Sequence, residues 1–470
     1  MPSYEELVRN DCSTFDRPFR PGTGTLIPTP RMGLRAEAGY NEASFPTMAT
    51  DYRRVADFLR KAVAGKPPEE IARLQPRHDP LPPRVPSSSE ITGEAVEARW
   101  QLPGLPQTAR EALFDQRTAD EASRYARNIE NFIGSARIPV GLIGPLRVNG
   151  LYANGDYYIP LATTEAALIA SHSRGTRLIS EAGGCTTLVL NEGVSRAPGF
   201  AFDTVVDAAL FVAWATSQME TFRRVASETT RYGELVDLQI TLEGNHVYLG
   251  FEFTTGDASG QNMVTIATDA ICRHLVANSP MPVRYHFVEA NLSGDKKATT
   301  HSFMTVRGRK VTAEVRLAAG LVTERLHTTT ARLMDYWHMS ALGGVMSGSI
   351  GVEGHYANSL AALFIATGQD AACVAEAAVG VTRFEPLEDG GLYASVTLPN
   401  MIVGTVGGGT GLPTQRACLE IMGMAGPGFG RAFAEVAAAV ALAGELSITG
   451  ALAAGHFTSA HQRLARPASP

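Results

Sequence analysis

Hydrophobic and polar positions change their spacing several times along the chain, and each spacing predicts a different kind of element. Residues 1–90 show little periodicity apart from a short helical pattern at 52–64, which predicts an extended arm with one helix. From residue 92 to 130 the pattern becomes helical and rich in charge. Beyond residue 310, helical patterns rich in Gly and Ala predict closely packed helices, with Gly-rich breaks at 343–354 and 404–411.

The segment 199–289 has the clearest order of periods. Short apolar or alternating runs predict strands, and longer stretches of 3.6-residue spacing predict helices. In chain order these are a strand at 200–205, a helix at 207–227, strands at 235–242 and 246–254, a helix at 259–277 and a strand at 283–289. Glu243-Gly244-Asn245 is a typical hairpin connection between the two middle strands. The order strand, helix, strand, strand, helix, strand predicts a ferredoxin-like module.

The most apolar stretch, residues 433–457, raises the question of a membrane span. Glu435 and Glu445 interrupt it, so a helix buried in the protein core is the better interpretation. The first residues contain neither a basic nor an apolar segment of the kind found in signal peptides. Five scattered cysteines without a C-x-x-C pair are typical of a reducing compartment and give no structural zinc motif. We therefore expect a cytoplasmic protein that does not bind a membrane.

Composition agrees with a soluble globular protein of more than one domain. Of 470 residues 44% are hydrophobic and 19% charged, and this length predicts two or three domains. Thirteen of the 27 prolines fall in the first 90 residues, which favours an extended or partly disordered arm there. A formal net charge of -6 argues against nucleic acid as the main partner.

Candidate chemistry lies in polar residues that stand in apolar or Gly-rich surroundings, because the chain has no complete G-x-G-x-x-G, P-loop or H-E-x-x-H motif. Thr163 or Thr164 could cap a helix and place Glu165 in its first turn, as a simple capping acid. Alternatively, Glu165 shares a helix face with apolar residues and His172 and is partly buried there. Asp370 follows an apolar helical run, as either a surface carboxylate or a buried, paired one.

Two further segments allow both a structural and a functional interpretation. The polar loop 289–298, with Lys296 and Lys297, is typical of a solvated turn, but it directly follows a strand, where functional sites are often built. His456 and His461 near the end of the chain lie five residues apart, roughly 140° around a helix, so they do not easily serve one site. The helix start at 256–263 and the glycines at 407–409 could each approach a phosphate group closely, although neither pattern is specific.

Several of these stretches recur together, in the same order, in one enzyme family. Glu130-Asn131-Phe132-Ile133-Gly134 resembles the dimerisation motif of 3-hydroxy-3-methylglutaryl-CoA reductases. The Thr-Thr-Glu stretch at 163–165, Asp-Lys-Lys at 295–297, Gly-Gln-Asp-Ala-Ala at 368–372 and Gly-Thr-Val-Gly-Gly-Gly-Thr at 404–410 resemble further motifs of that family. The resemblance covers residues 130–461, and the stretch 347–351 is closer to the class found in eukaryotes.

The resemblance implies an α+β fold and a domain layout. A large helical CoA-binding domain would comprise residues 91–198 and 290–450, with a small ferredoxin-like α/β NADP-binding domain inserted at 199–289. A proline-rich arm at 1–90 would precede it and a flap at 451–470 would follow. The resemblance also implies a homodimer or homotetramer with the active site at the dimer interface.

The family reduces the thioester 3-hydroxy-3-methylglutaryl-CoA to mevalonate and CoA with two NADPH, so the resemblance implies an acyl-CoA substrate, NADPH rather than NADH, and no metal. Lys296 resembles the lysine that faces the carbonyl oxygen, where negative charge develops. Asp370 resembles the acid that holds this lysine, and Glu165 resembles the general acid and base near the aldehyde. His461 resembles the histidine that protonates the departing thiolate, which leaves His456 a structural role.

The same resemblance implies two sets of binding residues. The substrate set is Arg196, Asn291, His327 and Asn358. The cofactor set is Arg174, Arg177, Asp257, Asn262, Lys297, Gly407 and Gly408.

Some residues depart from the family pattern. His327 stands where the family usually has a lysine that grips the free carboxylate of the substrate, and 257–261 reads Asp-Ala-Ser-Gly-Gln in place of Asp-Ala-Met-Gly-Met. The tail lacks the Asn-Arg-Ser that carries a regulatory phosphorylation site in animal and plant members. Two alternatives therefore stay open: a reductase of another acyl-CoA thioester, and a non-catalytic protein that binds a CoA ester or nucleotide.

Overall fold

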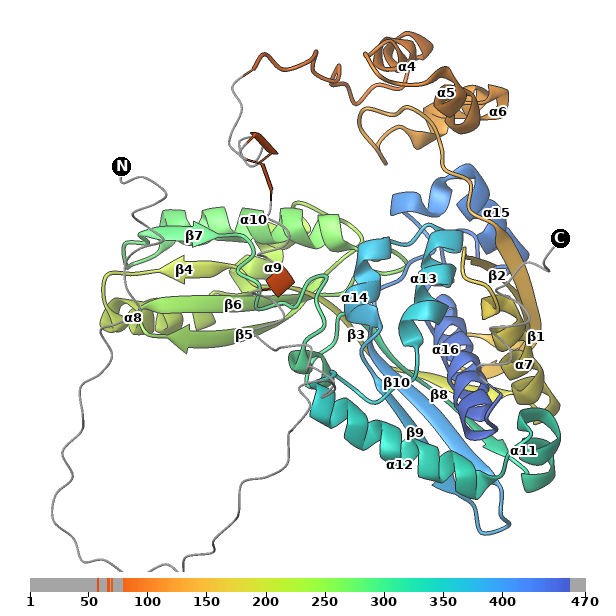
Figure 1. Ribbon diagram of the computed structural model, residues 1–470. Coiled ribbons are helices and arrows are strands. Elements are labelled where there is room, and N and C mark those ends of the chain that lie inside the picture. Colours follow the sequence, from red (N-terminus) through yellow and green to blue (C-terminus); the bar gives the residue numbers. More distant parts are fainter. Residues whose placement is uncertain (1–56, 59–65, 68, 71–78, 457–470) are drawn as a thin grey trace, which may run out of the picture. The chain divides into compact units, whose positions relative to one another are not determined.

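The computed structural model describes residues 57–58, 66–67, 69–70 and 79–456 (Figure 1). The chain divides into two units, Met1–Leu81 and Pro82–Pro470, and the fold described below is that of the second. Most of the expected proline-rich arm, nearly all of the helix expected at 52–64 and the flap beyond residue 456 lie outside the described residues. His461 lies outside them as well.

Short helices at the start of the second unit confirm the helical pattern of residues 92–130. They are α4 (Gly93–Trp100), α5 (Gln107–Leu113), α6 (Gln116–Asp120) and the 3-10 helix η2 (Ala122–Tyr125). Side chains that favour helix starts cap two of them: Thr92 accepts from the backbone N–H of Ala95, and Asp115 accepts from that of Thr118. Val96, Trp100 and Phe132 form a small separate core beneath these helices.

The ferredoxin-like module is confirmed in both element order and strand pairing. It comprises β4 (Gly199–Ala201), α8 (Val205–Thr216), α9 (Met219–Ser227), β5 (Leu235–Glu243), β6 (His246–Phe253), α10 (Gln261–Asn278) and β7 (Tyr285–Phe287). The strands lie in the antiparallel order β7-β4-β6-β5. The single helix expected at 207–227 is two helices, and the first starts at a capping box in which Thr204 and Asp207 satisfy each other's backbone N–H groups.

The large domain contains a second group of strands that the helical expectation did not include. Its strands lie in the order β2 (Asn154–Ala162), β1 (Val140–Gly150), β3 (Cys185–Arg196), β8 (Gly308–Leu317), β10 (Leu392–Met401) and β9 (Val381–Pro386). Only β1 and β3 pair in parallel; the other pairs are antiparallel. The end of β3 also pairs with β6, so this strand joins the two groups of strands into one ten-stranded sheet (Figure 1).

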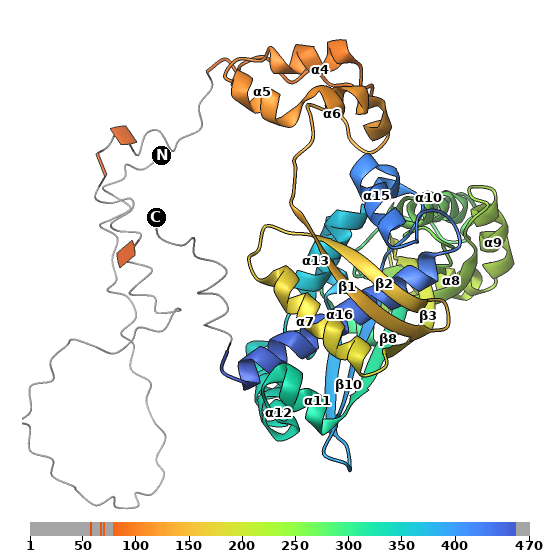
Figure 2. The ribbon, with the colours of Figure 1, turned by 90° about the vertical axis from the view of Figure 1, so that its right-hand side faces the viewer.

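Helices rich in small residues cover this sheet (Figure 2). They are α7 (Leu168–Glu181), α11 (Ala319–Leu326), α12 (Thr330–Ser347), α13 (Tyr356–Thr367), α14 (Val374–Ala377), α15 (Pro413–Ile421) and α16 (Gly430–Ala453). Helix α16 packs against α7, α13, β3, β8 and β10. Gly175 allows the close crossing of α7 and α16, because a Cβ there would collide with the carbonyl of Ala443.

Helix α16 is long and apolar enough to cross a membrane, but it lies almost wholly inside the protein. Glu435 and Glu445, the two acids that interrupt its sequence, are fully buried. The expectation of a buried core helix is therefore confirmed.

Candidate active site

A lysine and an aspartate from distant parts of the chain meet at the surface of the large domain. Lys296 Nζ lies 2.9 Å from Asp370 Oδ2, and both side chains are a little under half exposed. The hydrogen bond to Asp370 raises the pKa of Lys296 above its ordinary value, against a smaller opposing effect of burial. The ammonium group therefore stays charged at neutral pH. Both interpretations of Asp370 hold in part, since it is paired but not buried.

Local backbone structure presents each partner. Lys296 has a φ of +57° in the loop after β7, a left-handed conformation that residues with a Cβ adopt rarely. Asp370 stands at the start of the 3-10 helix η4 (Ala371–Cys373) and accepts from the backbone N–H of Ala372. This hydrogen bond orients the Asp370 side chain, which lies just after the end of α13.

A cavity of about 680 Å³ opens beside this ion pair. Its wall includes Lys296, Asp370, Asn262 on the first turn of α10, and Gly407 and Gly408 at the 3-10 helix η5 (Gly408–Gly411). Both glycines have positive φ and leave open space where a Cβ would stand, and α10 starts without a side-chain cap. The structure therefore brings together five of the predicted residues around a cavity whose backbone N–H groups are accessible.

Glu165 lies in a different environment and is not part of that cavity wall. It is exposed in a turn before α7, where its N–H donates to Thr163 Oγ1 and its Oε1 accepts from Asn358 Nδ2 at 3.3 Å. The expectation that it occupies the first turn of a helix, or shares a buried helix face, is wrong. The physical reason is Ala167, whose φ of +71° delays the start of α7 to Leu168.

Buried titratable groups lie behind Asn358. His172 Nε2 is 2.7 Å from Ser359 Oγ, and its ring stacks on that of His355 at 5.9 Å. Burial lowers the pKa of both histidines to about 4. Glu445 accepts from the backbone N–H groups of Gly354 and His355, both at 2.8 Å. We call the group formed by His172, Glu353, His355 and Glu445 the buried acid–histidine cluster.

Within this cluster, burial and the nearby Glu445 raise the pKa of Glu353 to about 8. The sequence patterns singled out neither Glu353 nor His355, because isolated acids and histidines in a Gly-rich connection carry no periodic signal.

Four residues of the predicted binding sets are engaged by other parts of the chain. Arg196 is buried and pairs with Glu289 and Asp295. Asp257 accepts from the backbone N–H groups of Gly428 and Gly430 at the start of α16. Arg174 donates to Ser447, and Arg177 pairs with Glu181. Their roles in ligand binding stay predictions.

Three further residues of the predicted binding sets are exposed. Asn291 is exposed, and Lys297 Nζ donates to the carbonyl of Asp295. His327 is exposed at the left-handed C-cap of α11, with its ring 5.9 Å from that of His456. The approach of these two histidines could not be foreseen, since 129 residues separate them in the sequence.

Three residues at the cavity were missed by the sequence patterns. Asn128 Nδ2 donates to the carbonyl of Gly408 at 2.7 Å, and Arg127 lies beside it. Gln369 exchanges two hydrogen bonds with the backbone of Gly404. A signal was present for Gln369, which lies within the motif at 368–372.

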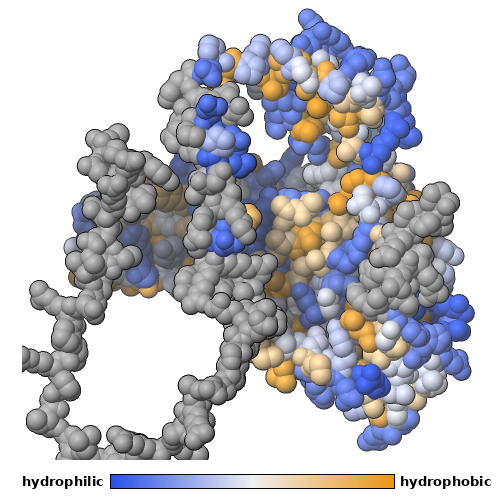
Figure 3. Space-filling model, viewed as in Figure 1, coloured by the Kyte–Doolittle hydropathy of each residue, from blue (hydrophilic) through white to orange (hydrophobic). Residues whose placement is uncertain are grey.

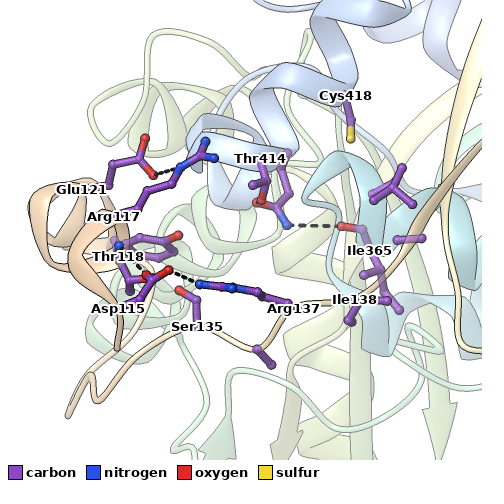
Figure 4. Close-up of a pocket in the computed structure, with 16 residues that line it drawn as sticks. Asp115, Arg117, Thr118, Glu121, Ser135, Arg137, Ile138, Ile365, Thr414 and Cys418 are labelled. Atoms are coloured by element: carbon purple, nitrogen blue, oxygen red, sulfur yellow. Dashed lines mark hydrogen bonds and ion pairs between the residues drawn. The ribbon is translucent and has the colours of Figure 1, made fainter. Parts of the chain in front are cut away.

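A second cavity, of about 500 Å³, lies near α6 and α15 (Figure 4). Its charged groups are paired with each other: Arg137 with Asp115, and Arg117 with Glu121. Ile138, Ile365 and Cys418 contribute an apolar part of the wall. This pairing leaves no unmatched charge of the kind seen in catalytic sites. In the part of the chain that the structure describes, no group of three or more His, Cys, Asp or Glu side chains is placed to hold a metal ion.

Comparison with known proteins places these motifs in a family. A family model described as Hydroxymethylglutaryl-coenzyme A reductase matches residues 95–466. The 3-hydroxy-3-methylglutaryl-coenzyme A reductase of Methanocaldococcus jannaschii is 44% identical over 352 residues, which cover 74% of this chain and 87% of that protein. The reductase 1 of Dictyostelium discoideum is 35% identical over 405 residues, covering 84% and 72%.

The fold is also found in a solved structure. The class II 3-hydroxy-3-methylglutaryl-CoA reductase from Streptococcus pneumoniae bound to NADPH has a TM-score of 0.57 at 20% identity, covering 73% of this chain and 95% of that one. Because the archaeal relative, at 44% identity, is more similar to this chain than the eukaryotic one, at 35%, closeness to the class found in eukaryotes stays a prediction. The chain belongs to the hydroxymethylglutaryl-coenzyme A reductase family.

Proposed function

We propose that this chain reduces 3-hydroxy-3-methylglutaryl-CoA to mevalonate and free CoA, with two NADPH per substrate. The observation that carries the proposal is the Lys296–Asp370 ion pair at the edge of the Gly-rich cavity, in a chain that belongs to this family. A permanently charged lysine is suited to stabilise the oxyanion that forms when a thioester or aldehyde carbonyl is reduced.

The residues around the cavity fit a dinucleotide. Gly407 and Gly408 have no side chain to obstruct a phosphate, and the uncapped start of α10 offers free backbone N–H groups. Asn262 adds a polar side chain to the cavity wall, and Asp257 holds the start of α16 in place. Lys297, next to Lys296 in the chain, is the positive member of the proposed cofactor set. Arg174 and Arg177 complete the proposed cofactor set. NADPH would supply the hydride when bound.

Each catalytic side chain has a physical task in this reaction. Lys296 stabilises negative charge on the carbonyl oxygen, and Asp370 orients it. Glu165 exchanges a proton with the substrate oxygen, held by Asn358. His461 protonates the departing CoA thiolate. Arg196, Asn291, His327 and Asn358 form the proposed substrate set.

We infer that the active form is a homo-oligomer with the site between two copies. Glu165 is not among the residues that line the cavity beside its own Lys296. Helix α12 also exposes an apolar stripe of Met339, Leu342, Val345 and Met346. Hydrophobic patches of this kind are visible in Figure 3, and such stripes mark interaction surfaces.

One assay tests the activity. The purified protein is mixed with 3-hydroxy-3-methylglutaryl-CoA while NADPH absorbance is followed and products are identified. Two NADPH per substrate, with mevalonate and CoA, are expected. Turnover of another acyl-CoA alone would point to a different substrate, and no turnover with any ester would favour the non-catalytic binding protein.

A further inference from the structure

A buried set of ion pairs lies directly behind Lys296. Its neighbour Asp295 accepts from two arginines, Arg196 on β3 at 2.9 Å and Arg307 just before β8 at 2.6 Å. Both arginine side chains are at most 6% exposed. A loop residue next to a catalytic lysine is therefore held from two separate strands of the core.

Arg307 also reaches the segment that carries the other catalytic partner. Its Nε donates to Glu376 and its Nη1 donates to the carbonyl of Ser195 at 2.8 Å. Glu376 is fully buried on α14, six residues after Asp370. The Lys296 loop and the Asp370 segment are thus joined at two points: an exposed one, Lys296–Asp370, and a buried one, Asp295–Arg307–Glu376.

The two carboxyl groups at the buried point respond differently to their surroundings. Burial acts to raise the pKa of Asp295, but Arg307 and Arg196 together hold it below its ordinary value. Burial raises the pKa of Glu376, and Arg307 and the backbone N–H of Lys296 oppose that rise. Buried charges of this kind are costly to separate, because each would be left without a partner in a poorly solvated interior.

We propose that Arg307 and Glu376 are positioning residues, which fix the left-handed Lys296 loop at the distance from Asp370 that catalysis requires. Neither side chain needs to touch substrate or cofactor. The planar guanidinium of Arg307 spans Asp295, Glu376 and the Ser195 carbonyl at once, which a single ammonium group does not do. The catalytic part of this inference rests on the proposed function.

The first test compares two buried glutamates. Glu376→Gln removes the carboxylate charge that pairs with Arg307. Glu435→Gln is the control: its carboxylate is equally buried but accepts from the backbone N–H groups of Tyr152 and Ala153, which are distant from Lys296 in the sequence. We expect Glu376→Gln to lower kcat by about 10- to 100-fold, as a displacement of about 1 Å does, with KM for the thioester changed less than about threefold. Glu435→Gln should lower thermal stability comparably but keep kcat within about twofold.

The second test separates geometry from charge at Arg307. Arg307→Lys keeps the positive charge but loses the planar fork, so kcat should fall nearly as far as in Arg307→Met. Full recovery of kcat in Arg307→Lys would overturn the geometric proposal. The proposal would also be overturned if Glu376→Gln and Glu435→Gln changed kcat, KM and melting temperature to the same extent.

A third measurement does not depend on activity. Hydrogen exchange of peptides covering 289–297 should accelerate in Glu376→Gln and Arg307→Lys, while the same peptides stay unchanged in Glu435→Gln. If the unaltered chain consumes no NADPH, the proposed function fails, and this exchange comparison still decides whether the ion pairs hold the loop. Unchanged exchange in both variants would refute the positioning role.

Discussion

Two regions behind the proposed catalytic residues bury titratable groups in opposite ways. Behind Lys296, carboxylates and arginines are buried as charged partners, with Asp295 between Arg196 and Arg307. In the buried acid–histidine cluster near Glu165, burial favours the neutral forms instead: the pKa of Glu353 is raised to about 8 and those of His172 and His355 are lowered to about 4. The carboxylate of Asp295 has two arginines as partners, whereas the cluster contains only glutamates and histidines.

The difference predicts different responses to pH. The pKa of Asp295 is held low by Arg307 and Arg196 against burial, and the hydrogen bond to Asp370 raises the pKa of Lys296. Both groups should therefore stay charged between about pH 5 and 8, and the Lys296 loop should hold its geometry there. The buried acid–histidine cluster should change protonation within or near that range. Catalytic geometry and pH-dependent stability therefore reside in separate parts of the fold.

The largest expected effect comes from removing the positive charge of Lys296. Lys296→Ala should lower kcat by several orders of magnitude while the thioester still binds, because one lost oxyanion contact costs roughly 3–4 kcal/mol. Lys297→Ala is the matched control and should act mainly on KM for NADPH. Steady-state kinetics and calorimetric binding check both variants, and half-retained turnover in Lys296→Ala would contradict the assigned role.

A mixing experiment tests whether the two regions of one chain serve the same site. Glu165→Gln and Lys296→Ala should each be nearly inactive alone. If each site takes Glu165 from one copy and Lys296 from the other, mixed dimers hold one intact site and the mixture should recover about a quarter of full activity. Activity is assayed after subunit exchange, with each variant alone as control. No recovery, despite demonstrated exchange, would place both residues in one chain's site.

The buried acid–histidine cluster should govern stability above neutral pH. Folded Glu353, with its pKa near 8, keeps a proton that the unfolded chain releases above about 4.5. This stabilisation is complete below pH 4.5 and is lost as pH rises through 8. The histidines act oppositely, since their contribution is lost as pH falls from 6.5 toward 4.

We therefore expect the melting temperature to fall between pH 6.5 and 8.5, and Glu353→Gln to remove most of that fall by several degrees. The exposed Glu388→Gln is the control and should leave the profile unchanged. Scanning calorimetry at several pH values makes the comparison. A Glu353→Gln profile parallel to that of the unaltered protein would contradict the argument.

The smallest expected effect concerns His327, which lies on neither side of this comparison. If His327 binds the free carboxylate of the substrate, His327→Lys should lower KM for 3-hydroxy-3-methylglutaryl-CoA a few-fold, because a charged ammonium group pairs with a carboxylate. If the true acyl group lacks a free carboxylate, the lysine variant should instead lose activity on the true ester. Steady-state kinetics with both kinds of ester make the comparison. A KM that His327→Lys changes for no ester tested would exclude this residue from acyl recognition.

The sequence by itself determined the parts of the molecule that depend on local pattern. Alternating and helical spacing at 199–289 gave the ferredoxin-like order, and the glutamates in α16 showed that this helix is internal. The resemblance of two short motifs to the family implied that Lys296 and Asp370 are partners, and their side chains form an ion pair at 2.9 Å. Each of these features is encoded within a few turns of chain, or within motifs whose chemistry is specific.

Only the tertiary structure decided what depends on contacts between distant segments. The second group of strands escaped prediction because it pairs residues as many as 128 positions apart, such as Thr186 with Glu314, and is flanked by Gly- and Ala-rich helices. Glu165 was misplaced because a single left-handed residue, Ala167, shifts the helix start. Arg307 and Glu376 lie in no motif, and 69 residues separate them. Only the whole fold decides that they are buried together, where removing one partner would leave the other charge unpaired.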